Sequence, residues 1–305
     1  MNRIATAGYL GNQLFQWAFG HYLVDETGAK FSMQLMSIPT NGWGNYLDFL
    51  VPHCEHMCIT QPRKIDNVRD KLVGKSEQII TDILEVKGQH KVLDFVSRLA
   101  KEQSRTNRLI PKYKNRLYYG YFQDVQYFNS IVSSISDELA SALQKIYVEK
   151  TLQNPEYLRM VKLIGENGDT TSDFQLVHVR RGDFLLCANS GFGVLSPSWY
   201  QKNMDSSLPI VIVTDDMQGS KDVIEVLRPI CVLNPELLTP LETLTLFGRA
   251  TTILCSNSTF SFWGGVYASY SQGKSVIAPN SFRPDRTGLE RLQLKGIDYR
   301  DAVFY

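Results

Sequence analysis

Two hydrophobic patterns alternate along the second half of the chain. Short apolar runs predict strands at 174–180, 209–213, 230–233, 252–256 and 275–279. Between them, apolar residues at helical spacing predict helices at about 197–204, 219–227, 240–250 and from about 260. Apolar strands that alternate with helices predict a parallel sheet covered on both faces. Sheets of this kind bind ligands at the carboxyl ends of their strands.

The first half of the chain begins with a similar pattern. Its first 30 residues predict a short strand, a glycine-containing turn and a helix that ends at Gly28. The apolar face of that helix comprises Leu14, Phe15, Trp17, Ala18 and Tyr22. Residues 116–122 are a strand candidate, and a long helix is predicted from Asp124 to Lys150. The polar stretch 165–172 is the clearest break, so we expect an N-terminal domain over 1–165 and a C-terminal domain over 166–305.

Composition and charge exclude few classes of protein. The net charge of +1 does not favour nucleic acid as a partner, but residues 61–116 carry +7 and leave −6 for the rest. That basic segment either contacts an anionic surface or forms a solvated helical face. No apolar run is long enough to span a bilayer, and the N-terminus lacks the apolar core of a signal peptide. We therefore expect a cytoplasmic protein whose five scattered cysteines are reduced.

Two adjacent arginines lie at the end of the predicted strand 174–180, in the sequence HVRRGD. Side chains alternate along a strand, so His178 and Arg180 share one face and Arg181 lies on the other. A guanidinium matches phosphate oxygens in bidentate geometry. We expect Arg180 to meet an anionic ligand and Arg181 to turn back to Asp183. The alternative is that both arginines form salt bridges within the protein.

Two further polar clusters follow predicted strands. Asp215 and Asp216 come after the run PIVIV, where they could hold a divalent metal, accept hydrogen bonds from a base or ribose, or cap a helix. The stretch CSNSTFSFWGG, 255–265, is rich in small and hydroxyl residues at a strand-to-helix junction. Free backbone N–H groups and the helix dipole favour an anion there, whereas simple capping is the alternative.

Two N-terminal motifs carry weaker signals. GYLGNQ, 8–13, precedes a helix, but it lacks both the dinucleotide-binding glycine pattern and the lysine of a phosphate-binding P-loop. HCEHMC, 53–58, offers two histidines and two cysteines, but residues so close together rarely supply four ligands to one zinc ion. We therefore expect no zinc site there.

These blocks together resemble a known family. They are GYLGNQLFQWAFG, YYGYFQDVQYF, VHVRRGDF, IVIVTDDM, CSNSTFSFWGG and SVIAPNSF, which lie between residues 8 and 283. The combination resembles the bacterial α-1,2-fucosyltransferases of glycosyltransferase family 11, whereas about 35–115 has no specific match. The resemblance implies an α/β protein of GT-B type, in which two Rossmann-like domains with parallel sheets face a central cleft. The N-terminal domain would serve the acceptor, and the C-terminal domain would bind the GDP-sugar.

The resemblance also implies a reaction. L-fucose would move from GDP-β-L-fucose, with inversion and without a metal or other cofactor, to the 2-hydroxyl of a galactose-terminated oligosaccharide. Such acceptors typically belong to O-antigen or other surface glycans, and this role is compatible with a peripheral contact between 61–116 and the cytoplasmic face of the inner membrane.

The family's site residues transfer position by position. His178, Arg180, Arg181 and Asp183 match the motif that contacts the GDP-sugar, and Asn12 and Gln13 match an N-terminal motif that reaches the cleft. The remaining matches are Asp215, Asp216, Ser256, Asn257, Ser258, Thr259, Phe260 and Ser261. The chain departs from the family pattern at Tyr9, Thr214 and Phe262, which replace a glycine, a serine and a tryptophan.

Chemistry assigns roles to three of these residues. Negative charge develops on GDP as the fucose–phosphate bond breaks, so Arg180 is the expected catalytic cation. Asp183 is a candidate base and Asn12 a candidate positioning group, although a loose, oxocarbenium-like route with a weak base stays open. Two rival functions are a metal-dependent transferase centred on Asp215 and Asp216, and a GDP-sugar-binding module without catalysis.

Overall fold

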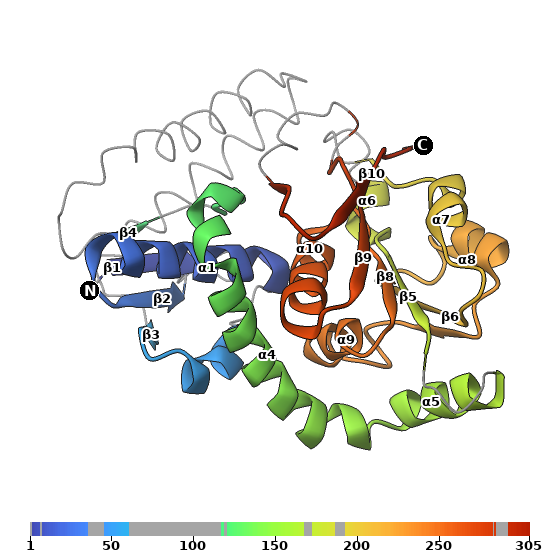
Figure 1. Ribbon diagram of the computed structural model, residues 1–305, viewed down its shortest axis with the longest axis horizontal. Helices are drawn as coiled ribbons and strands as arrows, with labels where there is room; N and C mark the ends of the chain where they lie inside the picture. The colour runs from blue at the N-terminus through green and yellow to red at the C-terminus, as the bar shows by residue number, and fades with distance from the viewer. Residues whose placement is uncertain are drawn as a thin grey trace. The chain divides into compact units, whose positions relative to one another are not determined.

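The protein consists of two compact units, Met1–Gln123 and Asp124–Tyr305. A computed structural model describes residues 2–6, 8–35, 46–60, 117–118, 121–167, 173–186, 193–282, 284 and 292–305 (Figure 1). Within the described ranges, each unit contains one parallel sheet, so the expected α/β class with two parallel sheets is confirmed.

The described residues of the first unit form a small parallel sheet and one long helix. Its strands are β1 (Asn2–Thr6), β2 (Phe31–Leu35), β3 (Met57–Thr60) and β4 (Leu117–Tyr118), in the order β3-β2-β1-β4. The helix α1 (Leu10–Thr27) connects β1 to β2, and a 3-10 helix, η1 (Asp48–His53), precedes β3. Gly28 ends α1 with φ 64°, a left-handed conformation that favours glycine. The predicted strand, turn and helix are therefore confirmed.

The second unit contains a larger parallel sheet. Its strands are β5 (Gln175–Val179), β6 (Ile210–Thr214), β7 (Cys231–Leu233), β8 (Thr252–Leu254), β9 (Ser275–Pro279) and β10 (Asp298–Arg300). The helices are α4 (Val132–Glu149), α5 (Pro155–Asn167), α6 (Gly182–Leu186), α7 (Pro197–Asn203), α8 (Lys221–Leu227), α9 (Pro240–Phe247) and α10 (Thr259–Val266). Short 3-10 helices, η3 (Val125–Tyr127), η4 (Asn129–Ile131) and η5 (Thr151–Gln153), flank α4, and a π-helix, η7 (Tyr267–Ser271), extends α10.

The order of these strands fixes where a ligand would bind. The sheet runs β10-β9-β8-β5-β6-β7, so the chain starts in the middle with β5, proceeds outward to β7, and then returns to the other side of β5 with β8. This is the doubly wound order, in which connections leave β5 and β8 in opposite directions. The carboxyl ends of β5 and β8 therefore form the switch point of the sheet.

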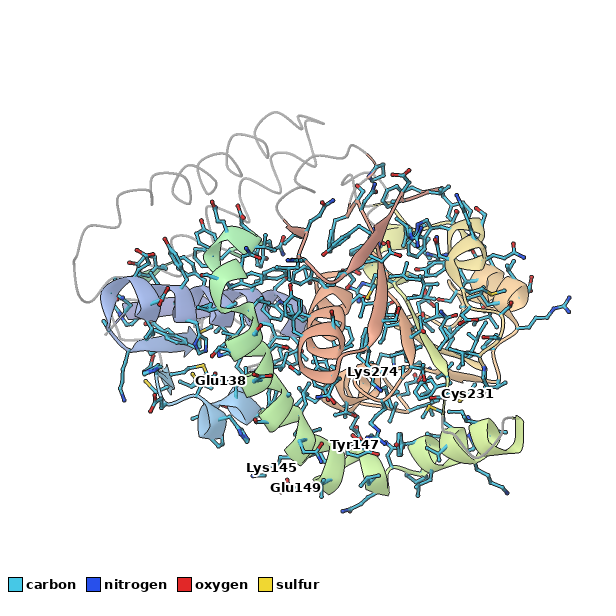
Figure 2. All side chains as sticks on the ribbon, viewed as in Figure 1. Glu138, Lys145, Tyr147, Glu149, Cys231 and Lys274 are labelled. Carbon is cyan, nitrogen blue, oxygen red and sulfur yellow. The ribbon has the colours of Figure 1, made fainter. Side chains whose placement is uncertain are left out.

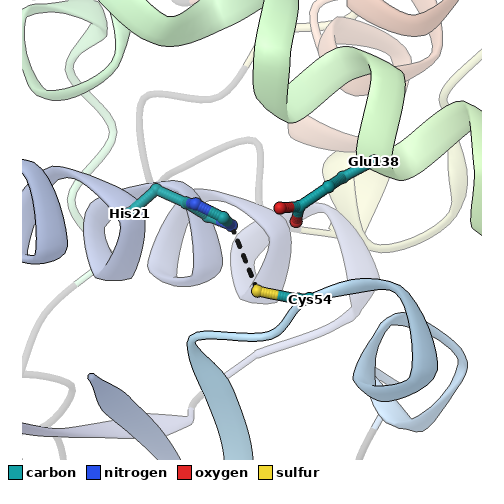
Figure 3. A group of neighbouring side chains, drawn as sticks. All are labelled: His21, Cys54 and Glu138. Atoms are coloured by element: carbon teal, nitrogen blue, oxygen red, sulfur yellow. Dashed lines mark hydrogen bonds between the residues drawn. The ribbon is translucent and has the colours of Figure 1, made fainter.

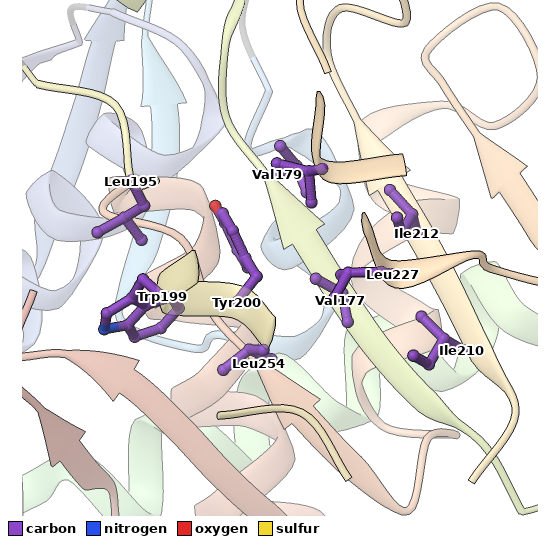
Figure 4. Close-up of a cluster of buried hydrophobic side chains, with 10 residues drawn as sticks. Val177, Val179, Leu195, Trp199, Tyr200, Ile210, Ile212, Leu227 and Leu254 are labelled. Atoms are coloured by element: carbon purple, nitrogen blue, oxygen red, sulfur yellow. The ribbon is translucent and has the colours of Figure 1, made fainter. Parts of the chain in front are cut away.

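A cluster of buried side chains covers one part of this sheet (Figure 4). Val177 and Val179 of β5 and Ile210 and Ile212 of β6 belong to it. The other members are Leu195, Trp199, Tyr200, Val223, Leu227 and Leu254. All five residues of β5 and all five of β6 are buried, as expected for strands covered on both faces.

Helices α4 and α5 belong to the second unit, which differs from the expected boundary at 165. Ser136 of α4 lies 2.5 Å from Ser271 between hydroxyl oxygens, and Thr151 lies 3.1 Å from Thr245. Tyr147, labelled in Figure 2, joins α4 to α5 through a hydroxyl–hydroxyl distance of 2.8 Å to Tyr157. The polar stretch 165–172 is thus a connection within the second unit, and the units divide after Gln123.

The basic segment 61–116 lies outside the described residues, so its expected contact with a membrane stays a prediction. Within the described ranges, every helix is too short or too polar to cross a bilayer.

Candidate functional site at the switch point

Three polar segments follow the ends of adjacent strands in the second unit. Val179 of β5 pairs in register with Thr214 of β6, and Val177 of β5 pairs with Leu254 of β8. The segments that begin at Arg180, Asp215 and Cys255 therefore leave the same edge of the sheet. The sequence prediction that these clusters gather at the strand ends is confirmed.

His178 bridges the switch point. Its Nδ1 lies 2.7 Å from the Ser256 hydroxyl oxygen, which connects the end of β5 to the segment after β8. The rings of Phe247 and Phe260 lie 6.0 and 5.4 Å from the imidazole between centroids, and only 5% of His178 is exposed. Burial, and then the charge of Arg180, lower the pKa of His178 to about 3. The imidazole is therefore neutral near pH 7.

This lowered pKa predicts a loss of stability in mild acid. In the unfolded chain His178 has a pKa near 6.5. As pH falls from 6.5 towards 3, the imidazole is therefore protonated in the unfolded chain and neutral in the folded protein. We expect the His178 contribution to lower the free energy of unfolding by about 2 kcal/mol between pH 7 and pH 5. Urea unfolding of the parent and of His178→Gln at both pH values measures it.

The matched control is His56→Gln, because His56 lies half-exposed beside Glu55. We expect this variant to lose stability in acid as the parent does, whereas His178→Gln loses about 2 kcal/mol less. Identical pH dependence in His178→Gln and the parent would contradict the lowered pKa.

Arg180 forms salt bridges within the protein, as in the alternative that the sequence left open for the two arginines. Its Nη2 lies 2.5 Å from Asp183 Oδ1, and its Nη1 lies 2.9 Å from Asp215 Oδ2. The side chains differ in exposure: 23% for Arg180, 52% for Asp183 and 19% for Asp215. The guanidinium therefore stands at the edge of the sheet between one partly buried and one exposed carboxylate.

Arg181 is buried as expected, but its partner is not Asp183. Its Nη2 lies 3.5 Å from Asp222 Oδ2, and its Nη1 donates a 3.4 Å hydrogen bond to the Arg180 carbonyl. The Tyr305 ring lies 5.8 Å from the guanidinium carbon, and the Tyr305 hydroxyl donates to Asp222. Asp183 pairs instead with Arg180. Arg181 thus stabilises the segment after β5 and is not placed to bind a ligand.

Asp215 and Asp216 form two separate local structures. Asp215 accepts a 2.8 Å hydrogen bond from the Arg181 backbone N–H and pairs with Arg180. Burial raises the pKa of the Asp215 carboxyl, whereas Arg180 and the N–H donors oppose this rise. Asp216 accepts from the Gly219 N–H at 2.9 Å within its own turn. Both oxygens of Asp215 are thus engaged by donors, a poor arrangement for a metal ligand.

The segment 256–261 provides a helix N-terminus at the switch point. Ser261 Oγ accepts a 3.0 Å hydrogen bond from the Ser256 N–H, and Ser258 is the N-cap residue of α10. Thr259 and Phe260, in the first turn, are partly exposed. The first N–H groups of a helix have no partner within it, and they favour an anion. Ser256, Ser258 and Ser261 are buried, so Thr259 and the backbone of this turn are the groups that a ligand could reach.

The amide nitrogen of Asn257 is engaged by two main-chain carbonyl groups. Its Nδ2 donates to the carbonyl oxygens of Gly193, at 2.7 Å, and Phe282, at 3.2 Å, and 1% of the residue is exposed. The side chain therefore holds two loops together, and the expectation that it binds substrate has no support from this arrangement.

Asn12 and Gln13 lie in the first unit. Gln13 is buried; its Nε2 donates to the Gly8 carbonyl at 2.9 Å and its Oε1 accepts from the Tyr46 N–H at 3.0 Å. Asn12 is half-buried and accepts a 2.9 Å hydrogen bond from Gln123 Nε2. Gly8, with φ 77°, supplies the left-handed turn, so Tyr9 can keep an ordinary extended backbone. Gln13 is thus structural, whereas Asn12 keeps its candidate role.

The cysteines and histidines of HCEHMC have different neighbours. Cys54 is buried, and its sulfur lies 3.5 Å from His21 Nε2 (Figure 3). His56 lies 3.2 Å from Glu55, whereas Cys58 lies on β3 and His53 ends η1. The expectation that these four residues hold no zinc stays a prediction.

Two residues of this region were not anticipated. Asp222 holds Arg181 from the first turn of α8, and Gly182 leaves room for the Asp215 carboxylate. An acidic residue in a first helical turn and a glycine after a strand are both common, so neither carried a usable signal.

Comparison with known proteins gives one family. The model of glycosyl transferase family 11 matches residues 97–288, more than half of the chain. A comparison with curated proteins finds no match.

Solved structures give distant likenesses. The NodZ alpha-1,6-fucosyltransferase co-crystallised with GDP is 12% identical, with 86% of this chain and 91% of that chain covered and a TM-score of 0.44. Fucosyltransferase NodZ from Bradyrhizobium is 11% identical, with 86% and 92% covered and a TM-score of 0.41. The E. coli heptosyltransferase WaaC with ADP is 10% identical, with 98% and 92% covered and a TM-score of 0.44. Likenesses this distant say nothing of a substrate.

Proposed function

This chain belongs to glycosyl transferase family 11, and on that basis we propose that it transfers L-fucose from GDP-β-L-fucose to the 2-hydroxyl of a galactoside, with inversion. The observation that carries the proposal is that Arg180 and the N-terminus of α10 follow β5 and β8, the adjacent strands whose carboxyl ends form the switch point. A guanidinium and a helix N-terminus both favour a diphosphate, and this edge is where doubly wound sheets bind nucleotides.

The donor would replace one partner of Arg180. Arg180 with Asp183 and Asp215 carries one net negative charge, which disfavours a diphosphate. Asp183 is the more exposed carboxylate, so it loses the least from leaving the guanidinium. The diphosphate would take its place, while Asp215 stays.

Each group then has a defined task in the reaction. The bond between the fucose anomeric carbon and the phosphate oxygen breaks, and its electron pair stays on GDP. Arg180 and the α10 N–H groups stabilise that charge more as it develops than in the bound donor. The acceptor oxygen forms the new bond and gives its proton to a base. Asp183, once released from Arg180, is the candidate base, with Asn12 as a candidate positioning group for the acceptor. The reaction needs no metal, because these groups supply the positive charge.

Product mass after incubation with a panel of donors and acceptors tests the proposal. We expect GDP-fucose and a terminal galactoside to give a fucosylated product in saturating EDTA, and UDP-sugars to give none. The position of the new linkage, read from the fragmentation of the product, should be the galactose 2-hydroxyl.

Three outcomes of this assay point elsewhere. Activity that EDTA removes and only Mn²⁺ or Mg²⁺ restores would favour a metal-dependent transferase, with Asp215 and Asp216 as ligands. Binding of GDP-fucose without any product would favour a non-catalytic module. A product linked at another hydroxyl would keep fucosyl transfer and overturn the proposed linkage.

A further inference from the structure

The Asp215 carboxylate ties the end of β6 to the segment after β5. Its Oδ1 accepts from the Arg181 N–H at 2.8 Å, and its Oδ2 lies 2.9 Å from Arg180 Nη1. One oxygen is therefore fixed by the main chain, and the other faces the guanidinium. Asp183 differs, since it contacts Arg180 from three residues away and its side chain is 52% exposed.

Residue 182 has to be small for this arrangement to exist. A Cβ at Gly182 would lie 2.4 Å from Asp215 Oδ2, far inside van der Waals contact. Oδ2 is the oxygen that contacts Arg180, so a side chain at 182 would displace that oxygen. The glycine is needed for this close approach and not for its backbone angles.

We infer that Asp215 is a positioning residue that fixes the direction of the Arg180 guanidinium, and that it can do so only because residue 182 is glycine. The inference rests on the proposed function and departs from the expectation that Asp215 binds substrate. Asp215 has no task towards the donor itself, because both of its oxygens already face protein donors. Its effect on the reaction passes through Arg180.

A double-mutant cycle tests this inference. We expect Gly182→Ala and Asp215→Ala each to lower kcat for GDP-fucose about 100-fold, since misplacing a catalytic group by about 1 Å has that effect. We expect the kcat of the double variant to be no lower than that of either single variant. The Asp215 carboxylate is already absent from it, so the methyl group added at residue 182 has nothing to displace. In an Arg180→Ala background, Gly182→Ala and Asp215→Ala should lower kcat no further, a result that general damage to the fold would not give.

Gly219→Ala is the matched control. A Cβ at Gly219 would lie 2.6 Å from Asp216 Oδ2, a similar contact in the neighbouring turn. We expect this variant to melt lower, as Gly182→Ala does, while keeping kcat within about threefold of the parent. Calorimetry with GDP, which needs no acceptor, gives the number of binding-competent chains by which each kcat is normalised.

Two results would overturn the inference and leave the proposed function intact. One is a multiplicative loss in the double variant, about 10,000-fold; the other is an equal loss with and without Arg180. A parent protein that does not bind GDP would instead overturn the proposed function, and the inference would fall with it.

Discussion

Arg180→Lys is expected to lower turnover of GDP-fucose about a hundred- to thousand-fold. Lysine keeps one positive charge but loses the planar fork, so it cannot face Asp215 and a diphosphate in the same way. Loss of one preorganised donor of this kind costs about 3–4 kcal/mol in the transition state. The measurement is kcat at saturating GDP-fucose and galactoside.

The stability of Arg180→Lys should change little. Lysine keeps a positive charge beside Asp215, and the pair with Asp183 is half-exposed, so the substitution costs less than about 1 kcal/mol. Arg159→Lys is the matched control, because Arg159 forms a surface pair with Glu156 at 2.7 Å in the same unit. It should keep full turnover. A fully active Arg180→Lys enzyme would mean that the guanidinium does not face the phosphate.

Arg181→Lys is expected to affect stability most. The Arg181 side chain is 1% exposed, and a shorter ammonium cannot reach both Asp222 and the Arg180 carbonyl. Removing one side of a buried pair costs about 3–5 kcal/mol, and the partial exposure of Asp222 places this case near 3 kcal/mol. For a unit of this size, that loss lowers Tm by about 6–12 °C. Calorimetry or urea unfolding measures it.

Arg300→Lys is the control that shows how much of the expected loss of stability comes from the burial of Arg181. Arg300 pairs with Asp298 at 2.5 Å on the surface, where both side chains are about half-exposed. Its substitution should cost less than about 0.5 kcal/mol. Equal losses of stability in Arg181→Lys and Arg300→Lys would contradict the assignment of Arg181 as a buried structural cation.

The sequence predicted the sheet of the second unit better than its boundary. Runs such as PIVIV identify buried strands because every residue in them is apolar. Helix α5 was not predicted, and its exposed residues Leu158 and Val161 blur the polar face that marks a surface helix. The short strands β2, β3 and β10 also lack a distinct pattern, because their definition depends on pairing with neighbours.

The candidate site, too, could be predicted from the sequence only in part. Its location follows from strand ends, which the sequence reveals, and the exposure of Arg180 relative to Arg181 follows from strand alternation. The partners of the two arginines could not be predicted. Asp222 lies 41 residues from Arg181 in the sequence. Asp215, which accepts a hydrogen bond from the Arg181 backbone N–H, lies 34 residues from it. Such contacts depend on how α6 and α8 leave the sheet.

The division of the chain after Gln123 determines how chimaeras of this enzyme should be joined. Helix α4 packs against α9 and the π-helix η7, and its buried residues include Ile135, Leu139 and Leu143. A fusion at the polar stretch 165–172 would take α4 and α5 from one parent and their contacts α9, η7 and β7 from another. The interface between them would then have to be matched anew. A fusion between Gln123 and Asp124 keeps that interface within a single parent.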